Sequence, residues 1–365
     1  VMLAGSPAAG DGSYLRLTSR HDGAQQTLDS EELQTWFYSS AYFNGSKVLV
    51  ELLAYPGTGP NRVEVASASV ASQEADPRTT CGESDRRVPS TDPRVARLVP
   101  GACSAFLVDE GDCANRFLTA GHCVSEPSSW RIAQFNVPPS RPNGQLVHPL
   151  PKDQYPVDLS SIQAVDEGEG RDYGTFLVGV NSETGLTPRA VQGAAFHLAD
   201  SVSRQPEDYW AGVQVTGYGV DLGSMNQTHQ KDSGLMLGKF DTTLRYRVDT
   251  QLGNSGSPVI NEIDDRVLGI HTHGGCTSSS TSFNRGNAID DPGLVQMLEN
   301  GPVGTCEEHQ FCVPDALWYF DGATSWDDRE PIDAWHDGRN CYVHALAPTD
   351  GEPFIHENRS YLVTP

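Results

Sequence analysis

Short apolar segments separated by turn-forming residues follow one another through the central part of the chain, from about residue 94 to 302. Strands are expected there at, for example, residues 104–108, 176–180, 213–217 and 267–271. Glycine, proline, asparagine and aspartate fall between these segments at short intervals, and helical periodicity is limited to one terminal helix expected over 292–299. The pattern predicts an all-β fold, either a barrel or a sandwich.

The first part of the chain shows the same β pattern on a smaller scale. Strands are expected over 47–55 and 62–70, with a turn rich in proline and glycine between them. Asp29 and Glu32 have the spacing of a capping box, in which each side chain bonds the backbone N–H of the other residue. A short helix is therefore expected to run toward Phe37.

Shifts in composition divide the chain into three expected units. Residues 1–75 form a small β-rich N-terminal accessory domain. Residues 76–304 form the main domain, whose polar first part, 76–93, is expected to be a lead-in or linker. Residues 305–365 form a small, disulfide-stapled C-terminal module that is rich in aromatic residues and cysteine.

The C-terminal module has two features with a structural and a functional interpretation. Its tryptophans either build a small core or form a polymer-binding platform, and they are Trp318, Trp326 and Trp335. Its acidic residues either form a solvated face or hold a structural calcium ion, and they are Asp321, Asp327, Asp328, Glu330 and Asp333. The spaced ligand loop with an internal glycine is missing, so the solvated face is favoured and no metal or other cofactor is expected.

Charge and cysteine content restrict the partners and the compartment. The 365 residues carry a formal net charge of −23, which repels nucleic acid and anionic membrane surfaces. No apolar run reaches the roughly 18 residues that a membrane span requires. Eight cysteines without zinc-type spacing indicate an oxidising compartment. We expect a secreted monomer, with a signal peptide removed or not included, because Val1-Met2-Leu3 lacks a basic and an apolar leader region.

Three short motifs carry the candidate chemistry. They are LTAGHC (118–123), DYGTFLV (172–178) and GNSGSPV (253–259). Each fragment alone also fits a structural role, such as a core histidine, a turn aspartate or a common glycine-serine turn. Together they place a histidine, an aspartate and a serine in the chain order that suits nucleophilic acyl transfer.

The chemistry assigns a role to each residue. Ser255 is the expected nucleophile and needs a base to take its proton. His122 can act as that base near neutral pH, and Asp172 would accept the other ring N–H and hold the productive tautomer. The backbone N–H groups of Gly253 and Ser255 would form the oxyanion hole, where glycine at 253 allows the required backbone geometry.

The motifs resemble those of chymotrypsin-like serine endopeptidases, and within this group the chain is most similar to the bacterial glutamyl endopeptidase branch. The resemblance covers roughly residues 95–300 and rests on the three motifs above with VTGYG (215–219), DTQLGNSGSPV (249–259), GIHTHGG (269–275) and the segment 284–289. It implies two packed antiparallel β-barrels with the site in the cleft between them, and proteins or peptides as substrates. Barrel one would supply His122 and Asp172, and barrel two would supply Ser255.

The resemblance also bears on disulfides and activation. It implies a bridge between Cys103 and Cys123, although Cys113 lies between them and could compete. A second bridge between Cys81 and Cys276 is a further expectation, because spacing alone does not define connectivity. Classical digestive members carry an aspartate just before the nucleophile, where this chain has Asn254, so we infer that it does not mature through that ion pair.

Two features of the expected pocket favour opposite specificities. Asp249 lies where the trypsin-type pattern places its pocket carboxylate, which would attract Arg or Lys. Thr250 and His271 match the pair with which glutamyl endopeptidases bind an acidic side chain, and a pocket histidine can donate a hydrogen bond to a carboxylate. We favour cleavage after Glu or Asp. The remaining residues expected to bind substrate are Thr272, His273 and Gly274.

Three alternatives to an acid-specific endopeptidase stay open at this point. They are a trypsin-like preference for Arg or Lys, a catalytically inactive binding protein on a protease scaffold, and an esterase. An esterase of the hydrolase fold would need a helix after the nucleophile, which Pro258 opposes, and a different chain order of the three residues.

Overall fold

The structure is a computed structural model that describes residues 12–58, 61–68, 79–109, 116–125 and 131–301 in full. Outside these ranges it describes the backbone of strands β1 (Met2–Ala4), β19 (Asp333–His336), β20 (Cys341–His344), β21 (Ile355–His356) and β22 (Arg359–Ser360). Cys113, the tryptophans and acidic side chains of the C-terminal module, and both predicted domain boundaries lie outside the described residues. The division into three units therefore stays a prediction.

Barrel one is a closed antiparallel barrel with strand order β10-β11-β12-β9-β8-β7. Its strands are β7 (Val95–Val99), β8 (Cys103–Leu107), β9 (Arg116–Thr119), β10 (Ile132–Gln134), β11 (Gln154–Asp166) and β12 (Asp172–Val178). Aromatic rings fill it, and Phe117 stacks on Phe176 with 5.2 Å between ring centroids. Strand β12 is buried along its whole length, so its first residue, Asp172, is fixed by the packing of the barrel.

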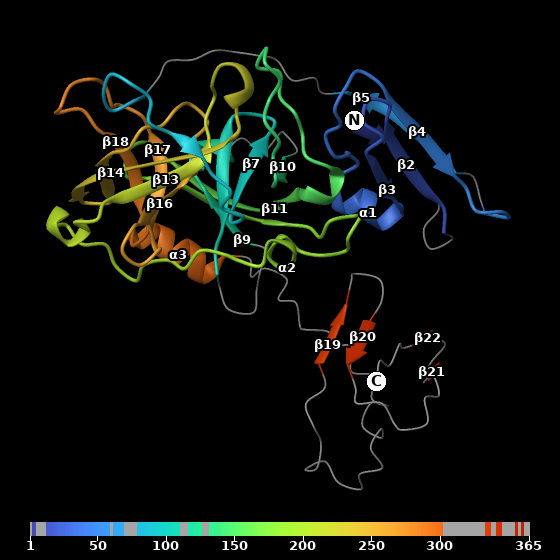
Figure 1. Cartoon of the computed structure of the whole chain (residues 1–365). Helices are drawn as coiled ribbons and strands as arrows, with labels where there is room; N and C mark the ends of the chain where they lie inside the picture. Colours follow the sequence, from blue (N-terminus) through green and yellow to red (C-terminus); the bar gives the residue numbers. More distant parts are fainter. Residues whose placement is uncertain are drawn as a thin grey trace, which may run out of the picture.

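Barrel two has six strands in the order β13-β16-β17-β18-β15-β14, and a β13–β14 pairing closes it. Its strands are β13 (Val213–Tyr218), β14 (His229–Phe240), β15 (Thr243–Arg247), β16 (Pro258–Asn261), β17 (Val267–His273) and β18 (Asn284–Ala288). Strand β15 alternates between buried and half-buried positions, with Leu244 and Tyr246 pointing inward. The expected all-β fold of two packed antiparallel barrels is thus confirmed (Figure 1).

Helices are few and short. The α-helices are α1 (Ser30–Thr35), α2 (Pro188–Gln192) and α3 (Pro292–Asn300), and the 3₁₀ turns are η1 (Gly121–Cys123), η2 (Pro151–Asp153), η3 (Pro206–Tyr209) and η4 (Gly223–Met225). Helix α3 confirms the expected terminal helix. None of the helices in the described ranges combines the length and the apolar character needed to span a bilayer.

The N-terminal unit is a three-stranded sheet of order β3-β2-β4, built from β2 (Tyr14–Ser19), β3 (Gln25–Leu28) and β4 (Val48–Leu53). The expected capping box is present at α1, where Asp29 and Glu32 bond each other's backbone N–H. The second expected strand, β5 (Glu64–Ser67), pairs with β1 instead of joining β4. Its side chains are exposed, so no buried face draws it into the main sheet.

The N-terminal unit and barrel one share a hydrophobic core. Leu33 and Trp36 are buried in one cluster with Val99 of β7 and Ile132 of β10. Burial of these apolar side chains removes them from water on both sides of the junction. The N-terminal unit is therefore packed onto barrel one, beside β10 and β11 in Figure 1.

A polar network continues this junction. Arg97 of β7 is completely buried, and its guanidinium donates to Gln134 Oε1 at 2.7 and 3.1 Å and to the carbonyl of Val147 at 3.0 Å. Gln134 in turn donates to Gln154, which exchanges two hydrogen bonds with the backbone of Tyr42 in the N-terminal unit. Burial without a carboxylate lowers the pKa of Arg97 to about 10.

The polar lead-in is attached to barrel two. Its strand β6 (Val88–Pro89) pairs with β14, and Thr79 forms a β-bridge with Thr250. The expected disulfide between Cys81 and Cys276 joins the same two parts of the chain, residues far apart in the sequence. The lead-in thus runs along the barrel as a bound strap of residues 79–89.

Candidate active site

His122 lies on the turn η1, directly after β9 of barrel one. Its Nδ1 is 2.7 Å from Asp172 Oδ2, and its backbone N–H donates to Asp172 Oδ1 at 3.0 Å. The preceding Gly121 packs so closely against Val165 and Tyr173 that a Cβ there would overlap their carbonyl oxygens. Glycine at this position therefore lets the turn sit against β11 and β12, which brings His122 to Asp172.

The two side chains adjust each other's protonation. Burial alone would lower the pKa of His122, but the hydrogen bond and the charge of Asp172 outweigh it and raise this pKa above its usual value of 6.5. Burial would raise the pKa of Asp172, but its bonds to His122 lower it below its usual range. Asp172 is thus an ionised carboxylate at neutral pH, placed to orient the imidazole and to stabilise its charged form.

Ser255 lies on a tight loop before β16. Gly253 has a φ of 94°, and a Cβ there would lie 2.6 Å from the carbonyl oxygen of Tyr218. Among the described residues, no acceptor pairs with the backbone N–H of Gly253 or of Ser255. These two N–H groups, expected for an oxyanion hole, are therefore available as donors.

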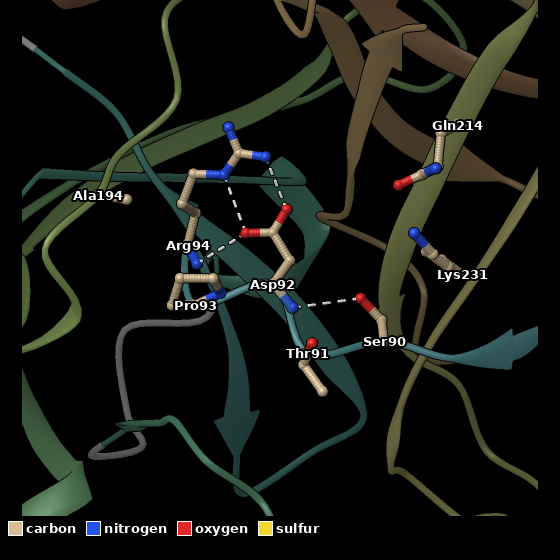
Figure 2. A pocket seen from close by; sticks show the side chains of 8 residues that line it. All are labelled: Ser90, Thr91, Asp92, Pro93, Arg94, Ala194, Gln214 and Lys231. Carbon is tan, nitrogen blue, oxygen red and sulfur yellow. Dashed lines mark hydrogen bonds and ion pairs between the residues drawn. The ribbon is translucent and has the colours of Figure 1, made fainter.

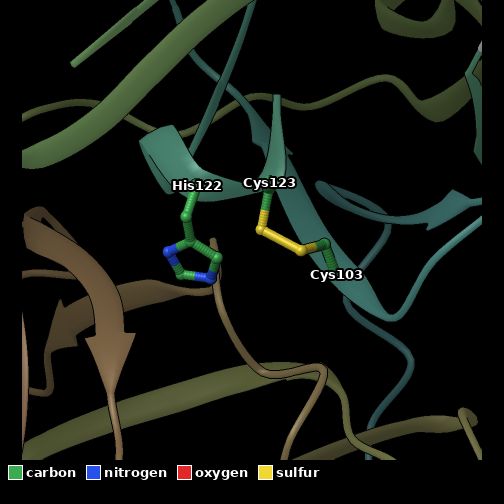
Figure 3. Close-up of side chains that lie close together, drawn as sticks. All are labelled: Cys103, His122 and Cys123. Carbon is green, nitrogen blue, oxygen red and sulfur yellow. A yellow bond between two sulfur atoms is a disulfide. The ribbon is translucent and has the colours of Figure 1, made fainter. Parts of the chain in front are cut away.

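The disulfide between Cys103 and Cys123 joins the histidine turn to the start of β8 (Figure 3). Ser104 N donates to the carbonyl of Ser255 at 2.8 Å, and Cys123 Sγ lies 3.8 Å from the same oxygen. A ring nitrogen of His122 and both sulfurs lie within 4.8 Å of one another. Because the sulfurs are bonded to each other, they are not thiolates, and this cluster lacks the ligands of a metal site.

The hydroxyl of Ser255 donates to the carbonyl of Thr272 on β17 at 3.4 Å. No hydrogen bond between Ser255 and His122 is present among the described residues. The histidine and aspartate are thus already paired, whereas the serine hydroxyl is directed to β17. Such catalytic bonds are often long or misaligned before substrate binds.

His273 is a second histidine beside Asp172. Its Nδ1 lies 3.8 Å from Asp172 Oδ2, and its ring centroid is 6.2 Å from that of His122. The same Nδ1 contacts the hydroxyl of Thr272 at 2.9 Å. His273 therefore lies next to the proposed catalytic pair, as expected for a residue of the cleft.

Asp249 is bound by the strap. Its Oδ1 accepts from the backbone N–H of Cys81 at 2.6 Å, and its Oδ2 accepts from that of Arg86 at 2.8 Å. The Arg86 guanidinium is 3.4 Å from the same carboxylate, and only 1% of Asp249 is exposed. Its charge is therefore satisfied within the protein.

Thr250 and His271, the pair expected to bind an acidic side chain, are also buried. His271 Nδ1 is 2.6 Å from the hydroxyl of Tyr246. Burial, with smaller contributions from His273 and His122, lowers the pKa of His271 to about 3, so its imidazole is neutral at neutral pH. Thr250 Oγ1 accepts from the side chain of Asn284 at 2.9 Å.

The sequence did not identify three residues that organise this region. Tyr246 holds His271, Asn284 bonds Thr250, and Thr79 donates to the carbonyl of Thr250 at 2.7 Å. Asn284 stands at the start of a segment that the resemblance covered, which was the only available signal. Tyr246 and Thr79 act through contacts between segments that are distant in the chain.

A surface pocket of about 410 Å³ lies elsewhere on the molecule (Figure 2). The residues that line it are Ser90, Thr91, Asp92, Pro93, Arg94, Ala194, Gln214 and Lys231. Arg94 and Asp92 form an ion pair of 2.7 Å inside it. None of the expected site residues lines this pocket.

Comparison with known proteins shows which family part of the chain resembles. Residues 103–270 match the family model of the trypsin-like peptidase domain. One similar solved structure is that of a Glu endopeptidase in complex with MPD, at 16% identity and a TM-score of 0.44, covering 60% of this chain and 98% of that one. Another is a thermostable serine protease from an extremophilic microorganism, at 13% identity and a TM-score of 0.40, covering 54% and 91%. No curated protein matches the chain.

Residues 103–270 are thus similar to the trypsin-like peptidase domain, and the chain forms two closed antiparallel barrels. The matched segment begins at Cys103 and includes His122, Asp172 and Ser255. It ends in β17, close to the residues expected to bind substrate.

Proposed function

We propose that this protein is a secreted serine endopeptidase that cleaves after Glu or Asp. The observation that carries the proposal is the pairing of His122 with Asp172 at 2.7 Å, beside a serine loop with two unpaired backbone donors. In this reaction Ser255 attacks the carbonyl carbon of the substrate while His122 takes its proton. His122 then gives that proton to the leaving amine, and water hydrolyses the acyl-enzyme with His122 again as base.

The proposed assignment of the oxyanion hole follows from the backbone of the serine loop. The N–H groups of Gly253 and Ser255 would donate to the negative oxygen of the tetrahedral intermediate. Removal of one such donor typically costs about 10²–10³ in rate. Within the described part of the chain these donors have no acceptor to give up, so they need no rearrangement when the charge develops.

Acidic specificity is supported by the states of the candidate pocket residues. Asp249 has both carboxylate oxygens bound by the strap, which disfavours its use as a partner for Arg or Lys. His271 is neutral, and the Tyr246 hydroxyl lies 2.6 Å from its Nδ1 and 3.1 Å from the carbonyl of Arg285. With the hydroxyl proton in the shorter contact, the proton of the ring lies on Nε2. That N–H, with Thr250 nearby, would donate to the carboxylate of a Glu or Asp side chain.

The direct test is digestion of a denatured protein mixture, with the cleavage sites identified by mass spectrometry. We expect cleavage after Glu, less often after Asp, and none by Ser255→Ala, which removes the nucleophile but keeps the fold. A fluorophosphonate reagent should label the wild type at Ser255 and leave the variant unlabelled.

Two results would contradict the proposal in different ways. Cleavage after Arg or Lys would support the trypsin-like alternative. A folded wild-type protein that neither cleaves the mixture nor reacts with the reagent would indicate an inactive, protease-fold binding protein.

A further inference from the structure

Arginine and aromatic side chains form a row on barrel two, beside β17. Arg245 of β15 and Arg285 of β18 are directly opposite each other in the antiparallel register. The Arg245 guanidinium lies 4.2 Å from the ring centroid of Phe240 and 4.9 Å from that of Phe283. The Arg285 guanidinium lies 4.7 Å from the same Phe283 ring. Stacking of this kind holds planar guanidinium groups in a defined orientation.

Arg285 reaches the segment of β17 that also contacts the nucleophile. Its Nη1 donates to the carbonyl of Gly274 at 3.3 Å, two residues beyond Thr272, which accepts from Ser255. The β17–β18 register shifts between His271 and His273, so Thr272 lies outside the regular ladder. The backbone from Thr272 to Gly274 therefore combines an irregular edge, a contact to the nucleophile and an adjacent cation.

The guanidinium of Arg285 already forms an ion pair with a carboxylate of the protein. Glu169 Oε2 is 3.1 Å from Arg285 Nε, and the side chains of the pair are 50% and 25% exposed. Glu169 belongs to the turn between β11 and β12 of barrel one, three residues before Asp172. The ion pair thus links the two barrels beside the candidate active site.

The turn that carries Glu169 is fixed against barrel two. Thr242 Oγ1 donates to the carbonyl of Gly170 at 2.7 Å. Gly170 has a φ of 76°, and a Cβ there would lie 2.5 Å from Thr243 Oγ1. The carboxylate of Glu169 is therefore presented to Arg285 by a well-defined backbone, which demonstrates that a carboxylate fits at this position.

We propose that Arg285 is a second specificity determinant, which binds an acidic side chain at the second residue before the scissile bond. The inference rests on the proposed endopeptidase function. An extended substrate that pairs with β17 and places the residue before the scissile bond opposite Thr272 has the preceding residue opposite His273. His273 is opposite Arg285 in the register of β17 and β18, so the substrate side chain at this position lies on the same face as Arg285, reaches its guanidinium and displaces Glu169.

The test compares two peptides that are identical except for Glu or Gln at the second position before the scissile bond. Both carry the residue that the digestion identifies as preferred at the bond itself. At low ionic strength, we expect wild-type kcat/KM to be about two- to five-fold higher for the Glu peptide, the range of a partly exposed ion pair. Arg285→Gln should bring this ratio to about one, and added salt should reduce it.

Removal of Glu169, which competes with the substrate for Arg285, should change the ratio of kcat/KM for the two peptides in the opposite direction. Glu169→Gln should raise the ratio above that of the wild type, because the guanidinium no longer has a partner in the free enzyme. Glu167→Gln is the matched control, since it removes the same charge from the same turn. In the wild type, Glu167 pairs with Arg171 at 2.7 Å and not with Arg285. Its ratio should equal that of the wild type.

Equal cleavage of the two peptides by the wild type and by Glu169→Gln would overturn the role of Arg285 and leave the endopeptidase function intact. If neither peptide is cleaved, the proposed function fails and the inference fails with it. Arg285→Lys keeps the charge and the aliphatic stem. If Arg285→Gln does not fold, the test uses Arg285→Lys and Glu169→Gln instead. Their ratios of kcat/KM for the two peptides are then compared with the wild-type ratio.

Discussion

At the scale of single residues, Asp172 is the most constrained group of the candidate site. It is completely buried, and both of its carboxylate oxygens bond His122, one through the ring and one through the backbone. The first bond selects the tautomer with the proton on Nδ1, which leaves Nε2 unprotonated and able to act as the base in the proposed reaction. The second bond fixes the turn that carries the ring, so one side chain controls both the orientation and the basicity of the histidine.

Asp172→Asn is expected to lower kcat/KM by about 10⁴-fold, because an amide nitrogen facing Nδ1 favours the wrong tautomer. The wild-type pKa of His122 is raised, so activity should rise with pH through a midpoint above 6.5 as the imidazole loses its proton. Loss of the negative charge should move this midpoint to lower pH in the variant. Peptide hydrolysis measured across pH checks both effects.

The control for this prediction is Asp166→Asn, at the end of β11. Asp166 raises the pKa of His122 only through its charge and forms no hydrogen bond with it. Its replacement should leave kcat close to that of the wild type, with a small downward shift of the midpoint. A fall in activity similar to that of Asp172→Asn would show that charge near the turn matters, and not the bond to Nδ1.

At the scale of elements, the strap of residues 79–89 stabilises the region of barrel two that contains Thr250. It contributes a β-bridge, a disulfide and the two N–H groups that bind Asp249. The carboxylate of Asp249 therefore has a structural role that does not involve the substrate. Breaking such a buried network leaves unpaired donors in the interior, which destabilises a protein more than the loss of a surface bond.

Asp249→Asn is expected to lower the free energy of unfolding by about 1–3 kcal/mol, because one of the bound N–H groups then faces an amide NH₂. The relative cleavage after Glu and after Lys should stay as in the wild type. Thermal unfolding and the digestion assay measure the two quantities separately. A gain of cleavage after uncharged residues, with loss of cleavage after Lys, would instead assign Asp249 to the substrate pocket.

Local patterns in the sequence predicted much of this architecture. The capping box of α1 and the terminal helix α3 depend on residues close together in the chain, and both were found where expected. Of the four barrel segments named in advance, 104–108, 213–217 and 267–271 match β8, β13 and β17 closely, whereas 176–180 covers only the end of β12. The disulfides between Cys103 and Cys123 and between Cys81 and Cys276 were expected and are present. The resemblance supplied the first of these pairings, which spacing alone could not.

The sequence could not predict features that depend on contacts across the fold. The pairing of β5 with β1, the hold of Tyr246 on His271 and the ion pair of Arg285 with Glu169 join segments that no local pattern relates. The role of Asp249 also depended on where the strap runs. Its position in the motif suggested a substrate ligand, whereas its partners in the fold are backbone N–H groups of residues 81 and 86.

At the scale of the whole molecule, the N-terminal unit and barrel one form one cooperative structure. Trp36 is 1% exposed and lies in the cluster that contains Val99 and Ile132 of barrel one. The network from Arg97 through Gln134 and Gln154 to Tyr42 crosses the same junction. We therefore expect the two parts to unfold together.

Trp36→Ala should lower the free energy of unfolding by about 3–5 kcal/mol, because it leaves a large cavity in the shared core. Peptidase activity should be lost at the same, lower temperature as the folded structure. The matched control is Trp210→Ala, since Trp210 is 81% exposed and its removal should change stability by less than about 0.5 kcal/mol. An unchanged midpoint for the loss of activity in Trp36→Ala would show that barrel one is stable without its N-terminal neighbour.

The shared core has a practical consequence for shortened forms of the protein. A chain that begins at barrel one would expose Val99, Ile132 and the edge of the Arg97 network to water, where they now face the N-terminal unit. Newly exposed apolar surface of this kind promotes self-association and precipitation. We therefore expect residues 12–58 to keep the two barrels soluble, and recombinant production should retain them.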